Sequence, residues 1–129
     1  MKSFYLGDFN LPAEVINGIQ LINTGEFFIA HEVLENIWRE APIPIRQLYQ
    51  GLIQYSVARL HIQNNNRQGA LKTILRSLGN LKPFEMAKVG FDITILIWSM
   101  QTMYERIDKA ATESISAAAI GIPLIEIDH

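Results

Sequence analysis

Apolar residues recur at the three- and four-residue spacing of an α-helix in five separate stretches of the chain. The predicted helices cover residues 12–23, 26–39, 45–64, 68–81 and 92–111. Helix-breaking residues separate them, namely Gly25, Pro42, Pro44 and Pro83, together with the polar turn Asn64-Asn65-Asn66. We therefore predict an all-α fold, in which about five mostly antiparallel helices form a single compact bundle and one domain over residues 1–129.

Two of the predicted helices are preceded by side chains typical of helix starts. Asn23 and Glu26 have the spacing of a capping box before the second helix, and Asp92 precedes the fifth. These residues predict that local hydrogen bonds cap both helices.

Apolar side chains also gather near the two ends of the chain. Residues 121–127 contain a glycine and a proline among apolar residues, which predicts an extended tail that docks on the bundle. The terminal apolar residues are Phe4, Tyr5, Phe9, Ile122, Leu124, Ile125 and Ile127. Because contiguous apolar patches usually mark interfaces, we expect a homo-oligomer, unless both termini fold onto their own bundle.

Composition narrows the function classes. The chain has 129 residues and no cysteine, so disulfides and zinc-thiolate sites are excluded. Its formal net charge of −2 supplies no broad positive field, so we expect no binding to nucleic acid or to an anionic membrane surface. The first residues lack an apolar signal segment, and the most apolar stretch is shorter than the ~20 residues that span a bilayer, so we expect a cytoplasmic protein.

The clearest chemical signal is the sequence His31-Glu32-Val33-Leu34-Glu35 in the second predicted helix. His31 and Glu35 lie one helical turn apart, and Glu32 flanks them. Because His31 and Glu35 fall on the apolar side of the helix, we expect them to be buried or partly buried.

A second polar stripe follows the third predicted helix. Its members share one side of that helix and are Gln47, Gln50, Gln54 and His61. The short connection between the second and third helices favours antiparallel packing, which would set this stripe against His31 and Glu35. The sequence thus predicts an inward-facing His/Glu/Gln cluster.

Three hypotheses account for such a cluster. In the first, it is a buried hydrogen-bond network in which Glu35 or a glutamine fixes His31. In the second, His31, Glu35 and His61 hold a divalent transition metal such as zinc, iron or manganese, with Glu32 as a fourth oxygen ligand or a base. In the third, His31 and Glu35 act as a metal-free acid/base pair. The zinc protease signature His-Glu-x-x-His is not matched, because Glu35 stands where its second histidine would be.

Several short motifs occur together between residues 20 and 81. They read Phe28-x-x-His31-Glu32-x-x-Glu35-x-x-Trp38, then Gln50-Gly51-Leu52-Ile53-Gln54, His61 and Asn66-x-x-Gly69-Ala70. In this combination the sequence resembles the bacterial and archaeal family catalogued as domain of unknown function 309. The resemblance implies a compact all-α fold and no established reaction. It places the family motif on His31, Glu32, Glu35, Trp38, Gln50, Gln54 and His61.

Two kinds of function follow from these observations. We expect a cytoplasmic helical protein that works as a non-catalytic binding or interaction module, with a small ligand or a protein as its partner. The alternative is a metal-dependent hydrolase or oxidoreductase that uses His31, Glu35 and His61.

Overall fold

Five α-helices form the fold of the described residues, which confirms the predicted all-α class. The computed structural model describes residues 4, 6, 7, 9–110 and 113–128. The α-helices are α1 (Ala13–Asn23), α2 (Phe27–Trp38), α3 (Ile45–Gln63), α4 (Arg67–Leu81) and α5 (Ile93–Lys109). Two short 3-10 helices are η1 (Lys82–Phe84) and η2 (Ser116–Ala119). Each α-helix begins within one residue of its predicted range, and residue 111, the predicted end of the fifth helix, lies outside the described residues.

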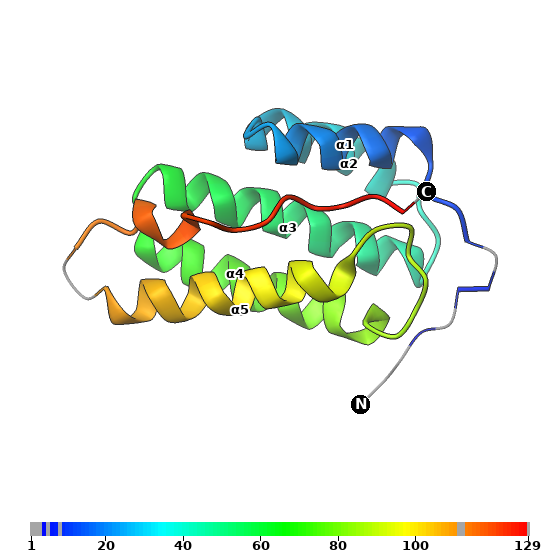
Figure 1. Cartoon of the computed structure of the whole chain (residues 1–129). Helices are drawn as coiled ribbons and strands as arrows, with labels where there is room; N and C mark the ends of the chain where they lie inside the picture. Colours follow the sequence, from blue (N-terminus) through cyan, green and yellow to red (C-terminus); the bar gives the residue numbers. More distant parts are fainter. Residues whose placement is uncertain (1–3, 5, 8, 111–112, 129) are drawn as a thin grey trace.

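The long helix α3 is the centre of the arrangement. It packs against α2 on one side and against α4 on the other, while α1 packs on α2 and α5 packs on α4. Figure 1 shows α1 with α2 and α4 with α5 on opposite sides of α3. Side chains of α3 therefore lie next to α2 on one side of the helix and next to α4 on the other.

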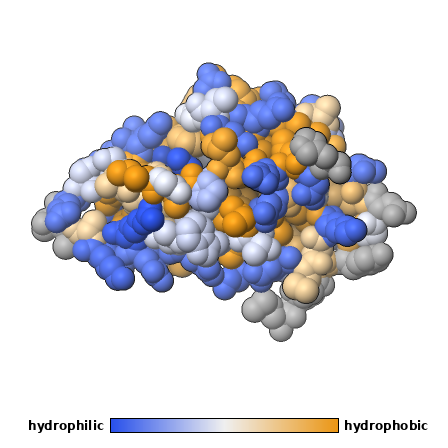
Figure 2. Space-filling model, in the orientation of Figure 1, coloured by the Kyte–Doolittle hydropathy of each residue, from blue (hydrophilic) through white to orange (hydrophobic). Residues whose placement is uncertain are grey.

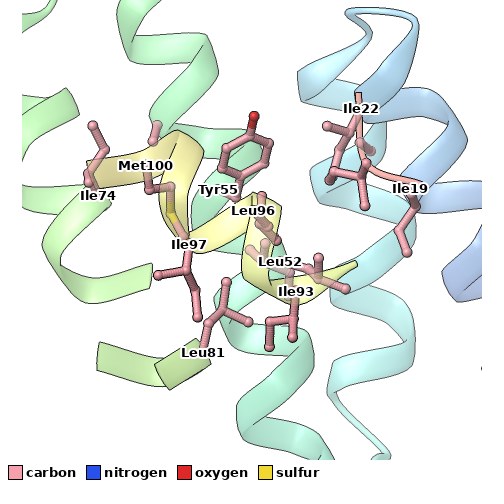
Figure 3. Packing of buried hydrophobic residues seen from close by; sticks show 14 of the residues in the cluster. Ile19, Ile22, Leu52, Tyr55, Ile74, Leu81, Ile93, Leu96, Ile97 and Met100 are labelled. Carbon is pink, nitrogen blue, oxygen red and sulfur yellow. The ribbon is translucent and has the colours of Figure 1, made fainter. Parts of the chain in front are cut away.

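The core is built from the apolar faces of these helices. Figure 3 shows isoleucine and leucine side chains of α1, α3, α4 and α5 directed toward one another around Tyr55. Tyr55 is 1% exposed, and its hydroxyl accepts a hydrogen bond of 2.8 Å from Nη1 of Arg59. Burial raises the pKa of Tyr55, and the charge and hydrogen bond of Arg59 oppose that rise.

The structure confirms one predicted cap and corrects the other. Asp92 caps α5, because its Oδ1 accepts from the backbone N–H of Ile95 at 3.1 Å. The capping box predicted for Asn23 and Glu26 is wrong. Glu26 precedes α2 without a side-chain cap, and the amide of Asn23 binds elsewhere. Gly25, with φ of +84°, turns the chain between α1 and α2 in the left-handed region that glycine tolerates best.

Asn23 holds the C-terminal tail instead. Its Nδ2 donates to the backbone oxygen of Ile125 and its Oδ1 accepts from the backbone N–H of Ile125, each at 2.8 Å. The tail then pairs with the segment before α5 through an antiparallel bridge between Phe91 and Ile127. In Figure 1 the tail, in red, runs along α3 between α1 and α5, and Figure 2 shows apolar residues along this path.

This docking covers most of the described terminal apolar residues within one chain. Ile125 is 4% exposed, and Phe4, Phe9, Ile122 and Ile127 pack against the core, whereas Leu124 is 62% exposed. Tyr5 lies outside the described residues. The homo-oligomer stays a prediction, but most of these side chains no longer give a reason for it.

No helix in the described part of the chain is long and apolar enough to cross a membrane.

Candidate functional site

His31 and Glu35 form the predicted pair on α2, one turn apart. His31 Nε2 lies 2.9 Å from Glu35 Oε2, and Arg39 Nη2 donates to the other carboxylate oxygen at 3.0 Å. The side chains of His31 and Glu35 are 31% and 33% exposed, so the expectation of partial burial is correct. Both oxygens of the carboxylate are thus occupied by partners on its own helix.

Trp38 lies two turns beyond His31 on the same side of α2. The guanidinium of Arg46 stands over the Trp38 ring at 4.4 Å from its centroid. Next to this pair lies a hollow of about 260 Å³, which we call the Trp38 hollow. It is lined by Trp38, Ile43, Arg46, Gln47, Gln50 and Asn80.

The glutamines of α3 line the groove between α2 and α4. Gln50 reaches the Trp38 hollow, while Gln54, one turn further, accepts a hydrogen bond of 2.7 Å from Nδ2 of Asn80 on α4. Within the described residues, the side chains of Gln47 and Gln50 have no hydrogen-bond partner. Two amides with open hydrogen-bonding capacity therefore stand beside an indole.

His61 belongs to a different part of the molecule, the corner between α3 and α4. Asn66 caps α4 by accepting from the backbone N–H of Gly69 at 3.1 Å, and its Nδ2 lies 3.1 Å from His61 Nδ1. With the Asn66 oxygen used by Gly69, its amide nitrogen must donate to His61. A Cβ on Gly69 would come within 2.8 Å of the His61 ring, so the glycine of the Asn-x-x-Gly motif makes room for this histidine.

The geometry corrects the predicted inward-facing cluster. His61 is not joined to His31 and Glu35, and no group of three or more His, Asp or Glu side chains among the described residues could hold a metal ion. Glu32 is exposed. His31, Glu35 and Trp38 on α2 are half-buried, as are Gln50 and Gln54 on α3, so these residues, which we call the surface strip, are not a core network.

Two residues that contact this strip, Arg46 and Asn80, lie outside the predicted cluster. Arg46 lies four residues before Gln50, a spacing that places both on one face of a helix. No comparable signal links Asn80 to Gln54, because 26 residues separate them.

Truncating Glu35 to alanine is expected to lower the free energy of unfolding by no more than about 1 kcal/mol, because its two ion pairs are half-exposed and lie within one helix. Urea denaturation of the variant measures this change. Glu32→Ala is the matched control, since Glu32 is exposed on the same helix and has no partner among the described residues. A loss of several kcal/mol at Glu35 would contradict the surface placement of the pair.

Part of the chain resembles known proteins. Residues 15–73 match the family described as Domain of unknown function (DUF309), which confirms the resemblance implied by the motif. Over 91 residues the chain is 35% identical to the uncharacterised protein YpuF of Bacillus subtilis (strain 168). That alignment covers 68% of this chain and 52% of YpuF, so the chain spans about half the length of this curated relative.

Proposed function

For a chain whose residues 15–73 resemble domain of unknown function 309, we propose a non-catalytic binding module that recognises an extended peptide segment of a partner protein in the Trp38 hollow. The observation that carries this proposal is the pair of unpartnered amides, Gln47 and Gln50, beside the Trp38 indole. The cytoplasmic location expected from the sequence is part of the proposal, and cell fractionation checks it.

The two amides match the chemistry of a peptide backbone. Each glutamine side chain offers one carbonyl acceptor and one NH₂ donor. A peptide bond offers the complementary N–H donor and C=O acceptor, so an extended segment can pair with Gln47 and Gln50 without supplying a particular side chain. Pairing of this kind favours a peptide over a purely apolar ligand.

The rest of the hollow suits an apolar side chain of the same peptide. Trp38 supplies a flat aromatic surface, and Arg46 covers part of that ring. Ile43, at the tip of the connection between α2 and α3, is 85% exposed. Aromatic residues and arginine are the side chains that most often anchor protein interfaces, so this edge of the hollow has the composition of a recognition site.

The ionisable residues of the motif support binding over catalysis. Each carboxylate oxygen of Glu35 has one partner, His31 or Arg39, and His61 Nδ1 accepts from the amide of Asn66. The groups left open at the Trp38 hollow are the amides of Gln47 and Gln50 and the guanidinium of Arg46, which form hydrogen bonds but do not act as acids or bases near neutral pH. Recognition therefore explains this arrangement better than the metal-dependent hydrolase or oxidoreductase.

The test uses the Trp98→Phe variant, in which Trp38 is the single tryptophan and its fluorescence reports on the hollow. Displayed random peptides are selected on this protein, and enriched peptides are titrated against it. We expect a change in Trp38 emission on binding, and an affinity at least about tenfold weaker in Gln50→Ala, since a pair of lost hydrogen bonds has that magnitude. Gln101→Ala, at an exposed glutamine of α5, is the matched control and should bind normally.

Two results would overturn the proposal. One is that no peptide is enriched on a folded protein. The other is that the enriched peptides bind equally well to Gln50→Ala and leave the Trp38 emission unchanged. Stoichiometric zinc, iron or manganese in protein purified without chelator would instead favour the metal-dependent alternative.

A further inference from the structure

A second hollow, of about 650 Å³, lies where the start of α1 meets the end of α2 and the first turns of α3. We call it the Tyr49 cavity. Its walls are mostly apolar and include Phe9, Val33, Ile37 and Ile45. This volume lies in the range of small-molecule sites, which span about 300–1,000 Å³ and are lined by apolar side chains with a few polar groups.

Tyr49 gives the cavity a polar group without a partner. Its side chain is 2% exposed and lines the cavity. Its hydroxyl has no hydrogen-bond partner among the described residues. The hydroxyl oxygen is not completely buried, and because Tyr49 lines the cavity, we infer that its small exposed surface opens to the cavity. Buried polar groups are normally satisfied, and here a bound molecule can supply the missing partner.

The charged side chains that line the cavity among the described residues are both carboxylates. Glu14 and Glu40 line it, and none of its lining residues in the described part of the chain is a lysine, arginine or histidine. Burial, and to a smaller degree the charge of Glu14, raise the pKa of Tyr49 to about 12 from 10.0. The phenol therefore stays protonated at neutral pH. In this form its oxygen can still accept a hydrogen bond from a cation.

We propose that the Tyr49 cavity binds a small organic ammonium ion that has an apolar aryl or alkyl body. The apolar walls take the body, while the Tyr49 oxygen and the Glu14 carboxylate accept hydrogen bonds from the ammonium group. Among the described residues the cavity shares no lining residue with the Trp38 hollow, so this proposal does not depend on the proposed peptide binding.

The experiment titrates the ¹⁵N-labelled full chain with three probes of one shape, 2-phenylethylamine, 2-phenylethanol and 3-phenylpropanoate, and follows backbone amide shifts. We expect the amine to shift the amides of Glu14, Val33 and Tyr49 in a saturable way. The neutral alcohol should bind at least about tenfold more weakly, and the carboxylate should not bind, because only the amine gains charge-assisted hydrogen bonds.

Paired variants assign the effect to the cavity. Glu14→Gln and Tyr49→Phe should each weaken amine binding by about threefold to tenfold, the size of one lost hydrogen bond. Glu105→Gln and Tyr104→Phe make the same chemical changes on α5, away from the cavity, and should leave binding unchanged.

Several outcomes would overturn the inference. Equal binding of the amine and the alcohol would show that the cavity selects only apolar bodies. Shifts confined to residues outside the cavity would place the ligand elsewhere. Undiminished amine binding in both folded cavity variants would remove the assigned hydrogen-bond partners.

Discussion

Replacing Leu34 by alanine is expected to lower the free energy of unfolding by about 2–5 kcal/mol. Leu34 is fully buried between α2 and α1, so truncation removes apolar contacts and leaves a void that the neighbouring helices fill only in part. Urea denaturation of wild type and variant measures the difference. An unchanged slope of the unfolding free energy against urea concentration would show that the surface exposed on unfolding is the same in both.

The contact between Leu34 and Gly18 sharpens this test. A Cβ built on Gly18 of α1 would lie 2.6 Å from Cδ2 and 2.7 Å from Cγ of Leu34. Gly18→Ala alone should therefore destabilise the protein by about 1–3 kcal/mol through overpacking. In the double variant the added methyl group lies beside the space left by Leu34, so the combined loss should be smaller than the sum. Strict additivity would contradict the direct contact between α1 and α2 at this point.

The second large effect is expected at Gly51, where α3 meets the end of α4. A Cβ on Gly51 would lie 2.5 Å from both Cγ and Cδ2 of Leu81, which is fully buried. The backbone oxygen of Gly51 also accepts a buried hydrogen bond of 2.7 Å from Ser77. Gly51→Ala should lower the free energy of unfolding by about 1–2 kcal/mol, because overpacking outweighs the better helix propensity of alanine.

Gly79 provides the matched control for this substitution. It is exposed in α4, and a Cβ there would meet no atom within 4 Å. Gly79→Ala should therefore stabilise the protein by about 0.5–1 kcal/mol, the ordinary gain of alanine over glycine in a helix. Thermal and urea denaturation of the two variants should thus give changes of opposite sign. Stabilisation by both substitutions would show that α3 and α4 are further apart than the structure has them.

The family motif has a structural part and an exposed part. At the corner between α3 and α4, Asn66 caps α4 by accepting from Gly69 and also bonds to His61 at the end of α3. Trp38 and Gln50 instead face a hollow at the surface. This division explains how a motif with two histidines and two glutamates can resemble a catalytic or metal-binding sequence while its histidines lie in separate environments.

The sequence by itself determined the helices. Apolar residues at helical spacing, with breaks at residues such as Gly25 and Pro44, are local signals, because a helix forms from contacts three and four residues apart. The same local geometry determined that His31 and Glu35 form a pair and that Asp92 caps α5. Each of these predictions involves residues at most four positions apart.

Only the tertiary structure decided which partners the polar side chains take across helices. Helical spacing fixes which residues share a side of α3, but the rotation of α3 about its own axis depends on close contacts such as Gly51 with Leu81. That rotation directs Gln54 to Asn80 and leaves Gln50 open beside Trp38. Asn23 binds the backbone of Ile125, 102 residues away, and no local pattern signals such a contact because it forms only after the bundle has brought α1 and the tail together.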